Sequence, residues 1–81
     1  MPYVYILKCS DNTLYTGYAL DVQRRIEQHN LGLASKYTRA RLPVKLVYQE
    51  EKNTVSEALK REIAIKKMTR EQKLNLIKSC G

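Results

Sequence analysis

Glu62 is the titratable residue whose place in the sequence most needs a chemical explanation, because it falls among apolar side chains. The helix expected from Thr54 to about Lys67 has one apolar sector on its wheel: Val55, Ala58, Leu59, Ile63 and Ile65. Glu62 lies near the middle of this sector, where burying a bare carboxylate costs several kcal/mol. It must therefore be protonated, form an ion pair with Arg25 or with Lys66 one turn further on, or bind a metal cation. The spacing alone leaves these alternatives open.

Two tyrosines, Tyr5 and Tyr15, would bring phenol groups together if they share one face of a β-hairpin. Two strand-forming runs flank Ser10–Asn12, whose short polar side chains favour a turn. A three-residue loop pairs Leu7 with Tyr15 and puts both phenols on one face, beside the gap left by Gly17. A two-residue loop would place them on opposite faces, and tyrosines in strands often only pack. We expect the three-residue loop.

An arginine and a histidine share the inward face of the next predicted element. A helix is expected over Val22–Asn30, with Asp21 as its N-cap. Arg25 and His29 lie one turn apart, in the same arc of about 100° as the aliphatic residues of this helix. They either face a common site with the phenols, or Arg25 reaches the rim and His29 bonds a buried carbonyl.

The charge of the chain favours a polyanionic partner. Its formal net charge is +7, from 15 Lys and Arg against 8 Asp and Glu, which suits nucleic acid or an anionic membrane surface. The connection Leu33–Leu42 places Lys36, Arg39 and Arg41 around Tyr37. Such cations contact phosphates while an aromatic ring stacks on an unpaired base, although a solvated loop would have the same composition.

The remaining pattern predicts an α/β (α+β) fold of order ββαβαα, a central three-stranded antiparallel sheet flanked by three helices. The third strand is expected over Val44–Gln49, with Val44, Leu46 and Tyr48 on one face, and a short last helix over Arg70–Ser79. A chain of 81 residues is expected to form one domain. Cys9 and Cys80 fit neither a zinc site nor a disulfide framework. No apolar run is long enough for a membrane span, and we expect a cytoplasmic protein. We also expect a monomer.

Several short segments, in this order, resemble the signature of GIY-YIG nucleases. They are YVY at residues 3–5, YTG at 15–17, RRIEQH at 24–29 and LKREI at 59–63. The chain departs from the usual signature at Tyr3, where the family has glycine, and at Thr16, where it has isoleucine. The stretches VYIL, LYTGY, KYTR and SEALKREIAIKK are most similar to the small stand-alone bacterial members of this superfamily, which are mostly uncharacterised.

The resemblance implies roles for the residues singled out above. It implies a catalytic set of four residues: Tyr5, Tyr15, Arg25 and His29. It makes Glu62 the ligand of one divalent ion, Mg²⁺ or Mn²⁺, which a single carboxylate can hold together with waters and a substrate phosphate. A tyrosine, here Tyr5, would be the general base, assisted by Tyr15 or His29. The further candidates for the site are Gly17, Lys66 and Asn75.

The function expected from these residues is Mg²⁺-dependent endonuclease activity on nucleic acid, DNA rather than RNA, guided by structure or weakly selective. Larger members of the superfamily carry separate DNA-binding domains, for which this chain has no room. Two other readings use the same residues. In one, the protein is a noncatalytic nucleic-acid-binding module with the same fold; in the other, it is a protein-interaction domain whose inward polar residues form a buried ion-pair network.

Overall fold

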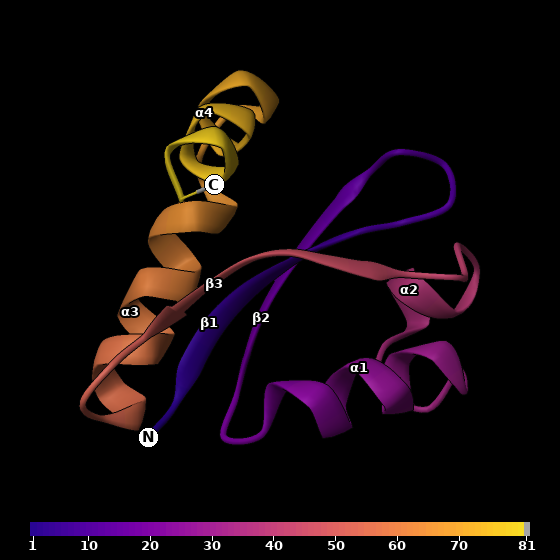
Figure 1. The fold of residues 1–81 in the computed structure, drawn as a ribbon, viewed down its shortest axis with the longest axis horizontal. Helices are drawn as coiled ribbons and strands as arrows, with labels where there is room; N and C mark the ends of the chain where they lie inside the picture. The colour runs from indigo at the N-terminus through magenta and orange to yellow at the C-terminus, as the bar shows by residue number, and fades with distance from the viewer. Residues whose placement is uncertain (81) are drawn as a thin grey trace.

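The computed structural model describes the backbone of residues 1–80 and the side chains of residues 1–79. Its centre is a three-stranded antiparallel sheet in the order β2-β1-β3 (Figure 1). The strands are β1 (Tyr3–Lys8), β2 (Leu14–Ala19) and β3 (Lys45–Glu51). The predicted α+β class and the antiparallel sheet are confirmed. The prediction about the Cys80 side chain lies outside the described residues.

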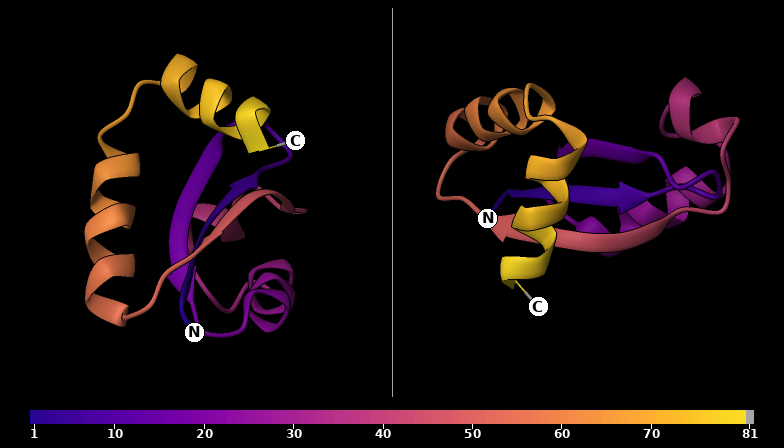
Figure 2. Two further views of the ribbon diagram at one scale, coloured as in Figure 1. Left: turned by 60° about the vertical axis from the view of Figure 1, so that its left-hand side comes forward. Right: turned by 90° about the horizontal axis from the view of Figure 1, so that it is seen from above.

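Helices cover both faces of the sheet (Figures 1 and 2). The helices are α1 (Val22–Asn30), α2 (Lys36–Arg39), α3 (Val55–Lys66) and α4 (Arg70–Cys80). One apolar cluster joins Tyr5 and Leu7 to α1, and the other joins Val4 and Ile6 to α3 and α4. No helix within residues 1–80 has the length and apolar character needed to cross a bilayer.

The helices begin where their caps predict. Asp21 caps α1 by accepting a hydrogen bond from the Arg24 N–H at 3.1 Å. The Thr54 hydroxyl caps α3 in the same way, and before α4 Thr69 and Gln72 form a reciprocal pair of bonds at 2.9 and 3.2 Å. The one-turn helix α2 is an addition to the predicted order. Four residues are too few to show a helical period, so the sequence pattern of this connection does not reveal it.

The hairpin has the expected register. Leu7 pairs with Tyr15 and Tyr5 with Gly17, so the two phenols lie on one face. The three-residue loop closes with a bond from the Cys9 N–H to the Thr13 carbonyl at 2.9 Å, and Asn12 takes the left-handed conformation at φ 69°. This loop length therefore decides which face of the sheet carries the phenols.

The Tyr5 ring packs directly against the backbone of Gly17. A Cβ at this position would lie 2.7 Å from Tyr5 Oη and 3.3 Å from Tyr15 Cε2. The distance to Tyr5 Oη is shorter than van der Waals contact allows, and the distance to Tyr15 Cε2 is unusually short. The absence of a side chain at Gly17 is thus what lets the phenol of Tyr5 lie flat against β2, where it is only 1% exposed.

The third strand corrects one prediction. It runs over Lys45–Glu51 and contains a bulge, because Leu7 pairs with Leu46 while Ile6 pairs with Tyr48. The extra residue turns Tyr48 to the opposite face, where it packs with Ile6, whereas Leu46 stays with the Leu7 cluster. The predicted alternation, with Leu46 and Tyr48 on one face, is therefore wrong at Tyr48.

The orientation of α3 corrects a second prediction. Only two of its apolar sector residues, Ala58 and Ile65, are fully buried. Three others are exposed by 39 to 52%: Val55, Leu59 and Ile63. The helix instead turns the row Ala58, Arg61, Glu62 and Ile65 inward. Arg61 is satisfied there because its Nε donates to Glu50 at 2.9 Å. Glu62 remains on the inward side, and its side chain is 15% exposed.

Replacing Gly17 by alanine should destabilise the protein by about 1–3 kcal/mol, because the new methyl group would displace the ring of Tyr5. Urea unfolding followed by circular dichroism measures the loss, and NMR should show shifted Tyr5 and His29 ring signals. Gly32→Ala is the matched control, since Gly32 has φ +78° and its substitution strains only the backbone. Unchanged Tyr5 signals in Gly17→Ala would contradict this role.

Candidate functional site

A chain of hydrogen bonds links β1, α1 and α2. Tyr5 Oη lies 2.9 Å from His29 Nε2, and His29 Nδ1 lies 2.8 Å from Thr38 Oγ1. The Thr38 hydroxyl donates to the Ser35 carbonyl at 3.3 Å, so it accepts the proton of His29 Nδ1. Nε2 of the neutral ring then has a free lone pair and accepts the phenolic proton of Tyr5. The network thereby assigns the tautomer of the histidine.

The members of this chain are buried, and their surroundings keep them neutral at pH 7. Tyr5 and His29 are each 1% exposed and Thr38 is fully buried. Burial raises the pKa of Tyr5, the neighbouring Tyr15 phenol and the Glu62 carboxylate raise it further, and the Arg25 guanidinium lowers it by less. Burial also lowers the pKa of His29, and the neighbouring Arg25 adds to this effect. The ring is therefore neutral, with a lone pair on Nε2 that faces the Tyr5 hydroxyl.

Tyr15 forms the outer wall of the same site. Its ring centroid lies 5.2 Å from that of His29 in an edge-to-face arrangement, and 6.0 Å from that of Tyr37 in a stacked one. Lys66 Nζ lies 6.0 Å from the Tyr15 centroid. Tyr15 is half-buried, so its phenol stands between the enclosed Tyr5 and solvent.

Arg25 and Glu62 bring opposite charges to the phenol from different helices. Both act on the pKa of Tyr5, the first from α1 and the second from α3. Glu62 Oε1 accepts a hydrogen bond from Lys66 Nζ at 3.3 Å, and the Lys66 side chain is 50% exposed. Of the two ion pairs predicted for Glu62, the pair with Lys66 is present. Within residues 1–79 no pair with Arg25 is formed at 4 Å or less.

The donor set at Glu62 fits a hard divalent ion. No group of three or more His, Cys, Asp or Glu side chains in the described part of the chain could hold a metal by itself. Mg²⁺ and Mn²⁺ do not need such a group, because they are often bound through one or two carboxylates with waters and substrate phosphate. The oxygens of Glu62 are hard ligands, and Lys66, which pairs with Oε1 at 3.3 Å, has a half-exposed side chain.

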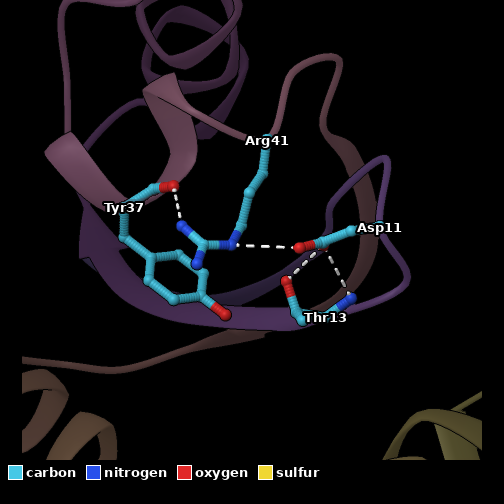
Figure 3. Close-up of polar contacts among 4 residues, drawn as sticks. All are labelled: Asp11, Thr13, Tyr37 and Arg41. Atoms are coloured by element: carbon cyan, nitrogen blue, oxygen red, sulfur yellow. Dashed lines mark hydrogen bonds and ion pairs between the residues drawn. The ribbon is translucent and has the colours of Figure 1, made fainter.

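Two of the residues predicted to bind nucleic acid are held by contacts within the protein (Figure 3). Arg41 Nε donates to Asp11 at 3.0 Å, its Nη1 donates to the Tyr37 carbonyl at 2.9 Å, and its Cζ lies 4.0 Å from the centroid of the Tyr37 ring. Asp11 also accepts from the Thr13 backbone and hydroxyl. This cluster fastens the α2 segment to the hairpin loop and fixes Tyr37 beside Tyr15.

Lys36 and Arg39 differ from this pair. Both are exposed on α2, and among the described side chains neither forms an ion pair within 4 Å. Their charges are thus available to phosphates in a way that the charge of Arg41 is not. The structure does not bring Asn75 to the phenols: it is exposed on α4, which packs on the opposite face of the sheet.

Sequence reasoning missed two residues that position this site. Thr38, within the segment taken as a basic connection, orients His29. Asn30 joins the end of α1 to β3, since its side-chain oxygen accepts from the Val44 N–H at 2.8 Å and its amide donates to the Val44 carbonyl at 3.3 Å. The polar Ser35-x-x-Thr38 spacing was a signal for a capped turn, whereas the Asn30 contact spans 14 residues and left no local signal.

His29 is the single histidine of the chain, so its titration can be followed without assignment ambiguity. We expect its pKa in the folded protein to lie below the ordinary value of 6.5. At a pH between the pKa of His29 in the folded protein and its ordinary pKa of 6.5, the unfolded chain binds the proton and the folded chain does not. The free energy of unfolding should therefore fall as pH drops below about 6.5, by up to about 1.4 kcal/mol per pH unit. NMR titration and urea unfolding measure both quantities.

Two observations would contradict this account of His29: a pKa above 6.5, or nitrogen shifts showing the neutral ring protonated at Nε2. Thr38→Val tests the partner at Nδ1 with little change in side-chain volume. It should lower the free energy of unfolding by about 1–3 kcal/mol, because the buried Nδ1 proton loses its acceptor. Thr69→Val on the exposed α4 cap serves as the control for a lost threonine hydroxyl.

Comparison with known proteins gives consistent results at the levels of family, sequence and structure. A family model described as the GIY-YIG catalytic domain matches residues 1–75. A UPF0213 protein of Staphylococcus aureus strain Mu3 is 63% identical over 76 residues, which cover 94% of this chain and 93% of the relative. The UPF0213 proteins of strains Mu50 and N315 match equally well.

Two solved structures are also similar. The solution NMR structure of the UPF0213 protein BH0048 from Bacillus halodurans has a TM-score of 0.62 at 43% identity, covering 96% of this chain and 84% of that one. The solution NMR structure of protein EF2693 from E. faecalis has a TM-score of 0.64 at 43% identity, covering 95% and 82%.

Proposed function

Because this chain belongs to the GIY-YIG catalytic-domain family, we propose that it is an endonuclease that hydrolyses phosphodiester bonds in nucleic acid using one divalent ion. One observation carries the proposal. The buried phenol of Tyr5 is hydrogen-bonded to a neutral imidazole, and the charges of Arg25 and Glu62 both act on its pKa. Separate elements supply these groups, as expected of a site for acid–base chemistry at a phosphate.

In this proposal Arg25 grips the nonbridging oxygens of the scissile phosphate through its fork of donors. Glu62 would hold the ion, Mg²⁺ or Mn²⁺, in place of its ion pair with Lys66. The chemistry supplied by such an ion would be neutralisation of the charge that develops on the phosphate and the leaving oxygen. Lys66, which already lies between Glu62 and Tyr15, can then pair with a neighbouring phosphate.

The general base in this proposal is Tyr5 acting through His29. A phenolate at Tyr5 is disfavoured, because burial outweighs the Arg25 charge and raises the pKa of the phenol. The phenol oxygen can still accept a proton from the attacking water if it gives its own proton to His29 Nε2 in the same step. The hydroxide attacks phosphorus, the imidazole becomes cationic, and the phenol stays neutral throughout. Tyr15 lines the route by which the water enters.

The substrate selectivity proposed here is weak. The cations available to phosphates, Lys36 and Arg39, lie on the α2 side of the site and give sequence-independent contacts. The net charge of +7 adds a general attraction for nucleic acid. We propose DNA rather than RNA as the substrate, a monomer as the active form and the reducing cytoplasm as its location, where the buried free thiol of Cys9 stays reduced.

One contact favours a second function. The pairing of Glu62 with Lys66 satisfies the carboxylate without a metal ion. If that pair is its permanent state, the protein is a noncatalytic nucleic-acid-binding module with the same basic surface.

Cleavage assays with Glu62→Gln and Tyr5→Phe distinguish the two functions. Single-stranded, duplex and branched DNA and RNA are incubated with Mg²⁺, with Mn²⁺ or with a chelator. We expect metal-dependent cleavage that falls by about 10²–10⁴-fold in both variants, because each removes a group from the proton or metal chemistry. Binding to DNA should change by less than about threefold.

Glu71→Gln is the matched control, since Glu71 is an exposed carboxylate in the first turn of α4. It should cleave like the unmodified protein. Cleavage that persists in Glu62→Gln, or in the presence of chelator, would contradict the metal role. Binding that weakens with salt but never leads to cleavage would instead establish the binding module.

A further inference from the structure

A pocket of about 350 Å³ lies beside the catalytic centre, where β2 turns into α1. Its floor is the turn Tyr18–Asp21, and its wall is the face of α1 that carries Arg24, Arg25 and Gln28. This volume is at the lower end of the range for small-ligand sites. The roles described above leave Arg24 and Gln28 unused.

Arg25 belongs to both the pocket and the catalytic centre. It lines the pocket, and its charge lowers the pKa of Tyr5 and of His29. A phosphate bound by Arg25 would therefore be close to both the phenols and the pocket, so the neighbouring unit of the same strand is the group nearest to the pocket.

The chemistry of the lining suits one nucleotide. The exposed Arg24 forms no ion pair within 4 Å among the described side chains, so its guanidinium can meet a second phosphate. The carboxylate of Asp21 accepts a hydrogen bond from the Arg24 backbone N–H at 3.1 Å. This bond reduces the repulsion between Asp21 and an anion bound in the pocket. Leu20, 67% exposed, offers apolar surface to a sugar or base, and the half-buried amide of Gln28 can both donate and accept.

We propose that this pocket is a subsite for the nucleotide next to the scissile phosphate, with Arg24 binding the 5′-phosphate of that nucleotide. The subsite rests on the proposed nuclease function for its place in the reaction. Its ligand class, a nucleoside monophosphate unit, is argued from the cationic, amide and apolar groups of the lining and not from turnover. Binding of a mononucleotide can therefore be measured without any turnover.

The test titrates the metal-free protein with thymidine 5′-monophosphate and, separately, with thymidine and with inorganic phosphate, while amide NMR shifts are followed. We expect the monophosphate to shift residues 18–21 and 24–28, and each partial probe to bind at least fivefold more weakly. Arg24→Ala should raise the Kd for the monophosphate at least fivefold. Arg70→Ala, which removes one equally exposed positive charge from α4, should change it less than twofold.

Two results would overturn the subsite: monophosphate shifts confined to other residues such as Lys36 and Arg39, or equal losses in Arg24→Ala and Arg70→Ala. The second result would show only a general attraction between a cation-rich protein and an anion. Failure of the nuclease proposal looks different. The monophosphate would still bind in the pocket and depend on Arg24, while no nucleic acid is cleaved with any metal.

Discussion

The hydrogen bond between the Tyr5 phenol and His29 Nε2 is the interaction on which the rest of this structure depends. It exists because Gly17 leaves room for the ring and because Thr38 takes the proton on the other histidine nitrogen. Each donor in this buried chain has an acceptor, so the network is rigid without an unsatisfied polar group. The hairpin, α1 and α2 must all dock correctly for it to form. The site and the fold on this face of the sheet are therefore stabilised together.

The carboxylate of the site comes from the other layer. Helix α3 packs on the face opposite to Tyr5 and is anchored there by Ala58 and Ile65. Because β2 is an outer strand of the sheet, Glu62 can act on the Tyr5 phenol past the sheet edge. Both charged residues in the inward row of α3 have partners, Arg61 with Glu50 and Glu62 with Lys66.

The parts of the fold predicted from sequence are those set by local chemistry. The polar turn determines the hairpin loop and hence the shared face of Tyr5 and Tyr15, and the caps at Asp21 and Thr54 determine where helices begin. Periodicity placed Arg25 and His29 inward. These features depend on residues a few positions apart, where propensity and spacing carry information.

The parts that were missed depend on contacts between distant residues. The bulge in β3 depends on how this strand pairs with β1. The exposure of Leu59 and Ile63 depends on how α3 packs on the sheet. The Arg41–Asp11 ion pair spans 30 residues, and it engages one of the cations that the sequence assigned to nucleic-acid binding. No local pattern encodes such contacts. Glu62 is nevertheless inward as predicted, because it belongs to both the predicted and the observed inward faces of α3.

Paramagnetic relaxation by Mn²⁺ tests the central claim most directly, because it locates a bound ion without requiring turnover. Mn²⁺ is added at substoichiometric amounts to the labelled protein, and amide and side-chain NMR signals are recorded. This account predicts selective broadening around Glu62, with Tyr5, Tyr15 and Arg25 affected next, and its loss in Glu62→Gln. Broadening centred on another acidic group, such as Glu50 or Asp11, with the Glu62 signals sharp, would contradict it.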